Sequence, residues 1–124
     1  MTIPTDLSYT DQHEWLRFDG DNARVGVTAY ASEALGDVVF IELPAIGSKL
    51  SAGEPCGELE STKSVSDLFA PANGEVVEIN QAVVDNPQLL NDDPFGTGWL
   101  FVMRLEGEAP LLDATAYAKL TTEG

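Results

Sequence analysis

The sequence contains little of the material from which catalytic and metal sites are usually built. Its 124 residues include a single cysteine, Cys56, and a single histidine, His13. One cysteine forms no internal disulfide and performs no two-thiol redox chemistry alone. One cysteine and one histidine also fall short of the usual zinc ligand set. A Cys–His nucleophilic pair remains formally available, but Cys56 stands in an ordinary strand context, which favours a structural thiol.

Catalytic and cofactor motifs are missing as well. The sequence has neither a phosphate-binding G-x-x-x-x-G-K-S/T loop nor a dinucleotide-binding G-x-G-x-x-G motif. His13-Glu14-Trp15 does not continue into the H-E-x-x-H zinc motif, and the acidic loop Asn91-Asp92-Asp93 lacks the spacing of a calcium-binding EF-hand. The sequence therefore predicts a protein that is not an enzyme in its own right.

Positive charge is scarce. Lys and Arg total 6 against 21 Asp and Glu, which gives a net charge of −15 with histidine neutral. A chain this acidic is repelled by nucleic-acid phosphates and by anionic membrane surfaces, because both carry charge of the same sign. We therefore expect no nucleic acid and no membrane among its partners, and we expect partners that carry basic patches.

Long hydrophobic runs are absent too. The densest apolar runs, at 38–41 and 99–103, are far shorter than the roughly 20 residues of a membrane-spanning helix. Residues 1–6 have neither the basic and apolar regions of a secretory signal nor the composition of a transit peptide. The sequence therefore predicts a cytoplasmic protein.

Apolar residues are nevertheless sufficient for a core. They make up 44% of the chain, which predicts one domain over residues 1–124 with its core at about 9–106. The pattern of alternation and turn residues is mainly β. We expect strands at 13–18, 23–28, 37–43, 56–61, 65–69, 75–80 and 99–106.

Short helical segments are expected beside these strands. Thr28 is placed to cap a helix that runs to Leu35 and ends at Gly36. Asn86-Pro87 is typical of the cap and first position of a short helical turn. Asp113 is placed to cap a C-terminal helix at about 113–121.

The sequence also contains a weak internal repeat. Residues 36–42, GDVVFIE, align with residues 74–80, GEVVEIN, and four of the seven positions are identical. Gly followed by an acid and two valines is a common way to open a strand, so chance alone explains part of the match. Two copies of one strand unit predict the two halves of a sandwich related by a pseudo-two-fold axis.

Lys63 is the most distinctive candidate for a functional side chain. It lies in a polar stretch, 60–64, between two half-apolar strands, where a hairpin turn is expected, so it should project from a tip. The turn lacks the Gly or Asn that two-residue hairpins prefer, so another constraint must shape it. Acidic residues surround the lysine in the sequence, namely Glu54, Glu58, Glu60 and Asp67.

Three interpretations of Lys63 are open from the residues alone. An ordinary exposed lysine in weak surface ion pairs is the simplest, and without further information it is favoured. A lone amine among carboxylates is also a suitable target for a modifying enzyme with a basic groove. A Schiff-base lysine is disfavoured, because that role requires a depressed pKa.

Over residues 9–117 the sequence resembles the glycine cleavage system H-protein family. The order and spacing of the matching pieces carry the resemblance, since each piece alone is weak. The pieces are Tyr9-Thr10, His13-Glu14-Trp15, 25–28 with Ala31, 35–44, 60–64 with Ser66-Asp67, Ala70-Pro71, 74–76, Asn80, Pro87, Leu90-Asn91, Pro94 and Gly98-Trp99.

This resemblance implies a fold and a modified residue. The family folds as a flattened β-barrel or sandwich like lipoyl and biotinyl domains, with short helices. Its Glu-Ser-x-Lys motif carries lipoic acid in amide linkage, and Lys63 is the matching lysine, with the attachment motif formed by Glu60, Ser61, Thr62 and Ser64. The family's usual Val before the lysine and frequent Ala after it are replaced here by small residues, so modification is expected to survive.

The resemblance also implies partners and a carrier function. The chain would shuttle the aminomethyl group of glycine from the P-protein, a pyridoxal-phosphate glycine decarboxylase, to the T-protein, an aminomethyltransferase. The L-protein, dihydrolipoyl dehydrogenase, would then reoxidise the arm, and a lipoyl ligase or transferase would attach it. Glu14 and Asp67 match acidic family positions near the cleft of the arm, where they would hold an aminomethyl ammonium. Surface carboxylates that only add charge are the alternative for both residues.

Other assignments are weaker. Biotin carriers have Met-Lys-Met where this chain has Thr62-Lys63-Ser64, and acyltransferase lipoyl domains typically have Asp-Lys-Ala. An H-like protein that relays lipoyl groups to other proteins, or that acts unmodified as an interaction module, is not separated from the main reading by sequence. An enzyme that uses Lys63 or Cys56 covalently is disfavoured.

Overall fold

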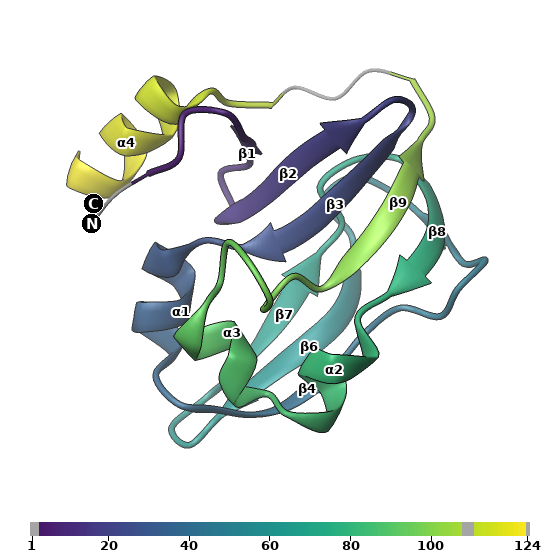
Figure 1. Ribbon diagram of the computed structural model, residues 1–124. Coiled ribbons are helices and arrows are strands. Elements are labelled where there is room, and N and C mark those ends of the chain that lie inside the picture. The colour runs from purple at the N-terminus through teal and green to yellow at the C-terminus, as the bar shows by residue number, and fades with distance from the viewer. Residues whose placement is uncertain (1–2, 108–110, 124) are drawn as a thin grey trace.

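The computed structural model describes residues 3–107 and 111–123 as two antiparallel sheets with short helices at their edges (Figure 1). The larger sheet has the strand order β1 (Ser8–Tyr9), β2 (Glu14–Asp19), β3 (Asn22–Val27), β9 (Phe101–Leu105), β8 (Gly74–Ile79) and β5 (Lys49–Leu50). The smaller sheet has the order β4 (Val38–Glu42), β6 (Pro55–Ser61) and β7 (Val65–Phe69). The predicted mainly β sandwich with short helices is confirmed.

The helices are α1 (Ala29–Leu35), α2 (Gln81–Asp85), α3 (Gln88–Asp92) and α4 (Ala114–Glu123). The predicted caps of the first and last are confirmed. The side chain of Thr28 accepts a hydrogen bond from the Ala31 amide at 3.3 Å, and that of Asp113 accepts one from the Ala116 amide at 2.8 Å. Within the described ranges, no helix has the length and apolar content needed to cross a membrane.

The main core lies between the two sheets. Because side chains alternate along each strand, one set points inward between the sheets. Leu35 of α1 and Leu90 of α3 pack into the same core. Burying each large aliphatic side chain stabilises the fold by about 1.5–3 kcal/mol before conformational entropy is counted. Its fully buried members include Leu16, Val25, Val76, Leu90, Leu100, Phe101 and Met103.

A second buried cluster attaches α4 to the opposite face of the large sheet. Its centre is Trp15 on β2 together with Tyr9 and Tyr117, whose rings stack with centroids 4.7 Å apart. Tyr9 and Leu112 also exchange backbone hydrogen bonds of 2.8 and 2.7 Å, which anchor the chain just before α4. The C-terminal helix is therefore packed against the β1 edge of the large sheet (Figure 1).

The predicted internal repeat coincides with a matching irregularity in the structure. The ladder of β4 shifts register between Val38 and Phe40, and that of β8 shifts between Val76 and Glu78. The alignment places Val38 on Val76 and Phe40 on Glu78, so both copies carry a bulge at the same repeat position. The two copies lie in different sheets, as the repeat predicted.

Some predicted boundaries were wrong around Asn80. We expected a strand through Asn80 and another from Trp99, but β8 ends at Ile79 and β9 begins at Phe101. The reason is the Asn80 amide, which donates hydrogen bonds to the carbonyls of Thr97 at 2.9 Å and Trp99 at 2.7 Å. These bonds tie Asn80 to residues 97–99, and α2 begins at the next residue, so β8 ends one residue earlier and β9 begins two residues later than predicted.

Smaller elements were missed. The single-turn α2 was not predicted, and Pro87 stands as the cap of α3 and not as its first residue. The two-residue strands β1 and β5 were also not predicted, because two residues carry no detectable alternation.

Candidate functional site

Lys63 occupies the tip of the hairpin formed by β6 and β7, as predicted. The turn is shaped by the side chain of Ser61. Its hydroxyl accepts hydrogen bonds from the amides of Lys63 at 3.3 Å and Ser64 at 3.1 Å, while the Ser61 amide donates to the Ser64 carbonyl at 2.8 Å. The hydrogen bonds of Ser61 therefore stabilise the turn, which has neither the Gly nor the Asn that hairpin turns prefer.

A second set of contacts fixes the hairpin tip to the body of the protein. The Thr62 amide donates to the Asp37 carbonyl at 3.1 Å. The side chain of Asn91 on α3 binds the residues on either side of Asp37. It donates a hydrogen bond to the Gly36 carbonyl at 2.7 Å and accepts one from the Val38 amide at 2.8 Å. The tip is therefore a rigid base for a side chain.

The Lys63 side chain lies across Gly36, at the end of α1. A Cβ added to Gly36 would stand 3.3 Å from the Lys63 Cε, and Gly36 has a φ of 80°, which other residues rarely adopt. Among the described residues, Lys63 makes no ion pair within 4 Å. The surface ion pairs favoured from sequence alone are therefore not formed.

The acidic surroundings of Lys63 are arranged differently from the sequence order. Glu54 precedes β6 and lies at the end of the hairpin away from the tip, so its predicted place beside the lysine was wrong. Glu60 pairs with Phe40 on one side and Val65 on the other, near the tip. Glu58 lies two residues before Glu60 on β6, further from the tip.

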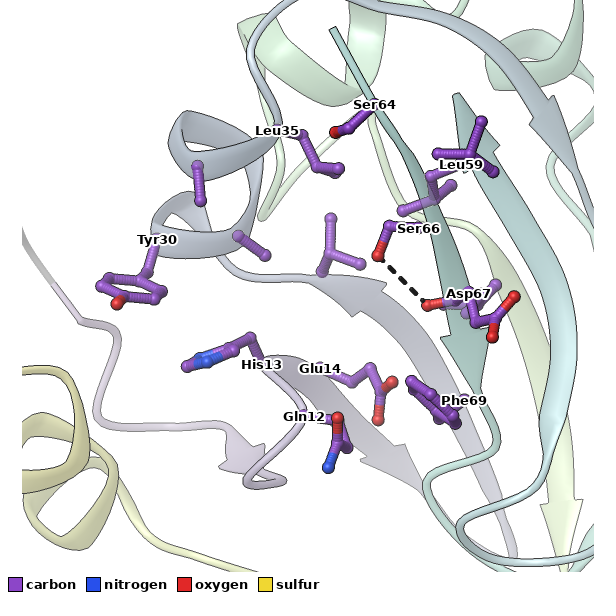
Figure 2. A pocket seen from close by; sticks show the side chains of 15 residues that line it. Gln12, His13, Glu14, Tyr30, Leu35, Leu59, Ser64, Ser66, Asp67 and Phe69 are labelled. Carbon is purple, nitrogen blue, oxygen red and sulfur yellow. Dashed lines mark hydrogen bonds between the residues drawn. The ribbon is translucent and has the colours of Figure 1, made fainter. Parts of the chain in front are cut away.

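A cavity of about 420 Å³ opens beside the hairpin, between α1, β7 and the start of β2 (Figure 2). The structure brings Ser64, Asp67 and Glu14 to its walls. The two acids differ in orientation. Glu14 points toward Phe69, whereas the carboxylate of Asp67 is directed away from Glu14 (Figure 2).

Glu14 is a buried carboxyl group, with 2% of its surface exposed. Burial raises its pKa to about 7, although hydrogen bonds from the Thr10 hydroxyl and the Phe69 backbone act in the opposite direction. The Thr10 hydroxyl lies 2.8 Å from Glu14 Oε1. Glu14 therefore bridges β2 to the free edge of β7, and it changes charge near neutral pH.

Sequence reasoning missed a hydrogen-bonded network on the far wall of this cavity. His13 lines the cavity with a φ of 65°, and its Nδ1 lies 2.8 Å from the Tyr117 hydroxyl. That hydroxyl lies 2.7 Å from the hydroxyl of Thr28, and the His13 ring packs on Tyr30 at 4.6 Å. Burial lowers the pKa of His13. No local pattern could have revealed the contact, because Tyr117 follows His13 by 104 residues.

Cys56 is half-buried, and burial together with the nearby Glu14 carboxyl raises the pKa of its thiol to about 12. A thiol with such a pKa is a poor nucleophile, which agrees with the structural role predicted for it. Across residues 3–107 and 111–123, no three His, Cys, Asp or Glu side chains are grouped so that they could hold a metal ion.

These features define a class: a two-sheet sandwich that presents an exposed lysine on a rigid hairpin tip beside a cavity. Comparison with known proteins then gives the family. The glycine cleavage H-protein family model matches residues 7–124. The chain therefore belongs to the glycine cleavage H-protein family.

Individual relatives agree along nearly the whole chain. The glycine cleavage system H protein of Beutenbergia cavernae is 57% identical over 122 residues, which cover 98% of each chain. That of Thermobifida fusca is 52% identical, covering 98% of this chain and 97% of the relative. The crystal structure of a glycine cleavage system H protein from Mycobacterium marinum superimposes with a TM-score of 0.92 at 50% identity, covering 97% of this chain and 99% of that one.

Proposed function

We propose that this chain is the lipoyl carrier of a glycine cleavage system, with lipoic acid attached to Lys63 by an amide bond. The observation that supports the attachment is the hairpin tip itself. Lys63 is exposed, makes no ion pair to the described residues, and rests on Gly36 beside the cavity. Amide formation would remove its charge without breaking an ion pair, changing the formal charge from −15 to 5 − 21 = −16.

The residues of the tip fit such a group. Glu60, Ser61, Thr62 and Ser64 form the proposed recognition motif, and the Ser61 turn fixes the backbone of Lys63 at the tip. When attached, a lipoyl group supplies a disulfide that accepts the aminomethyl group and a dithiol that returns electrons, chemistry that a single cysteine does not provide. A rigid tip with a long arm raises the effective concentration of the carried group at each docked partner.

Glu14 and Asp67 are proposed to act at the cavity end of the arm. A buried carboxyl with a pKa of about 7 becomes a carboxylate when an ammonium approaches, because opposite charge favours its ionised form. Glu14 would thus hold an aminomethyl ammonium and shield it from water. Asp67 takes part only after its side chain turns toward the cavity (Figure 2).

The proposed partners are the P-protein, the T-protein and the L-protein, together with the lipoyl ligase or transferase that modifies Lys63. Charge on the small sheet supports docking of basic surfaces. Glu58 lies directly opposite Glu42 on one side and Asp67 on the other, and within the described residues none of the three forms an ion pair. Like charges placed opposite each other destabilise a sheet. A basic partner would relieve that repulsion, so docking should weaken as salt is raised.

The decisive experiment is the intact mass and peptide map of the protein purified from its native cell, where we place it in the cytoplasm. A lipoyl adduct confined to Lys63 is expected. Lys63→Arg should abolish the adduct, while Lys49→Arg, a matched change on the other sheet, should keep it. A bare Lys63 in cells whose other lipoyl proteins are modified would favour an unmodified H-like module. A biotinyl adduct would contradict the carrier assignment.

A further inference from the structure

The outer face of the large sheet gathers most of the positive charge of this acidic chain. Arg17 lies directly opposite Arg24, and the register of the ladder places Arg104 and Lys49 on the same face. These are four of the 6 basic residues in the sequence. The face therefore differs in charge from the small sheet, where carboxylates line up.

Two of these four cations, Lys49 and Arg104, form ion pairs with Glu75. Glu75 lies 3.1 Å from the Lys49 ammonium and 3.4 Å from the Arg104 guanidinium. Arg17 and Arg24 form no ion pair within 4 Å among residues 3–107 and 111–123. Like charges directly opposite each other cost stability, and among the described residues no carboxylate within 4 Å of either arginine offsets that cost.

Both arginines are held in position by tryptophan rings. The Arg24 guanidinium carbon lies 4.6 Å from the centroid of Trp99, and that of Arg17 lies 5.8 Å from the centroid of Trp15. Trp15 is fully buried and donates its indole N–H to the Pro94 carbonyl at 2.9 Å. A guanidinium stacked on a fixed ring keeps its N–H edge free for a planar oxyanion, and little side-chain entropy is lost on binding.

The two arginines line a hollow of about 420 Å³. Its lining also includes the apolar Val102, which is in register beside Arg24, and the carboxylates Asp19 and Glu78. Those two carboxylates, with the net charge of −15, oppose a polyanion, whereas the two guanidinium groups can together bind a single carboxylate. We propose that this hollow docks a protein segment that presents one carboxylate side chain beside an aliphatic one.

This surface is remote from the lipoyl arm. The β2–β3 turn and the β6–β7 turn lie at opposite ends of the molecule (Figure 1). A partner held by Arg17 and Arg24 leaves Lys63 and its cavity free, so the docking is independent of the carrier function.

A titration followed by NMR tests the proposal on the full-length protein. The probe is a capped tetrapeptide with Glu next to Leu, and its Gln analogue is the control. The Glu peptide should shift the amides of β2, β3 and Val102 and the Nε–H signals of the two arginines, in a saturable way. The Gln analogue should bind more weakly, by up to about tenfold, because hydrogen bonds to a charged acceptor are stronger than those to a neutral amide.

Variants separate the arginine pair from general charge. Arg17→Gln with Arg24→Gln should lower the affinity about tenfold or more. Arg104→Gln removes the same charge from the same face and should leave affinity within about twofold, because Glu75 already engages Arg104. Equal loss in all variants, equal binding of the Gln peptide, or shifts centred on the hairpin tip would overturn the proposal. Tighter binding of inorganic phosphate than of the Glu peptide would also overturn it, since the site would then take free anions.

Discussion

The buried carboxyl group of Glu14 should make the stability of the protein depend on pH. Burial raises the pKa of Glu14 from 4.5 to about 7. The folded protein therefore keeps a proton on this group over a pH range in which the unfolded chain has released it. The free energy of unfolding has its full Glu14 contribution below pH 4.5. It falls as the pH rises from there to about 7, and it stays low above that pH.

The size of the effect follows from the shift. Each unit of pKa difference corresponds to about 1.4 kcal/mol, so Glu14 should remove about 3 kcal/mol of stability between acid and mildly alkaline pH. That is a large share of the free energy of unfolding of a small domain, which is typically about 5–15 kcal/mol. Desolvation is the main cause, and the hydrogen bonds from Thr10 and Phe69 already reduce it.

Urea denaturation of the wild type and of Glu14→Gln, measured at steps from pH 4 to pH 9, provides the assay. Gln retains an acceptor for the Thr10 hydroxyl but does not titrate, so its stability should lack this fall. His13 acts with the opposite sign, because burial lowers its pKa, and it is present in both proteins. The difference between the two curves therefore isolates Glu14. Curves that run parallel through this range would falsify the reasoning.

Three further changes test the supports of the site. Tyr117→Phe removes the hydroxyl shared by His13 and Thr28 and should lower the free energy of unfolding by about 1–3 kcal/mol. Tyr9→Phe in the same aromatic cluster is the control that leaves those two contacts intact. Gly36→Ala should cost about 1–3 kcal/mol, because a φ of 80° with a ψ of −155° is a conformation that essentially only glycine adopts, and it should slow lipoylation of Lys63 in a ligase assay by crowding the Lys63 side chain. Asn91→Ala should cost about 1–3 kcal/mol in the same denaturation assay, and an unchanged midpoint would contradict its role as a brace for the tip.

Local sequence signals predicted the elements that depend on local physics. The hairpin tip at Lys63 was readable because a polar stretch separates two half-apolar strands. The caps Thr28 and Asp113 were readable because a hydroxyl or carboxylate before a helix satisfies free amides. The opposition of Arg17 and Arg24 was also within reach, since pairing the predicted strands 13–18 and 23–28 as a hairpin places residue 17 opposite residue 24.

Contacts between distant segments were not readable. The side-chain amide of Asn80 donates hydrogen bonds to the carbonyls of Thr97 and Trp99 at the end of β8. The residues next to Asn80 in the sequence do not indicate these partners. The burial of Glu14 depends in the same way on β7, which reaches it only in the folded sheet pair. A carboxylate in an acidic sequence suggests surface charge, and only the fold shows that this one is withdrawn from water.

The contact between His13 and Tyr117 has a practical consequence. Because the chain contains a single histidine, its imidazole gives one unambiguous set of NMR signals. That ring touches the C-terminal helix through Tyr117, the start of α1 through Tyr30, and the cavity beside Lys63. The protein thus contains an intrinsic spectroscopic probe that needs no label or mutation. Its signals report whether α4 is packed against the sheet and whether the cavity is occupied.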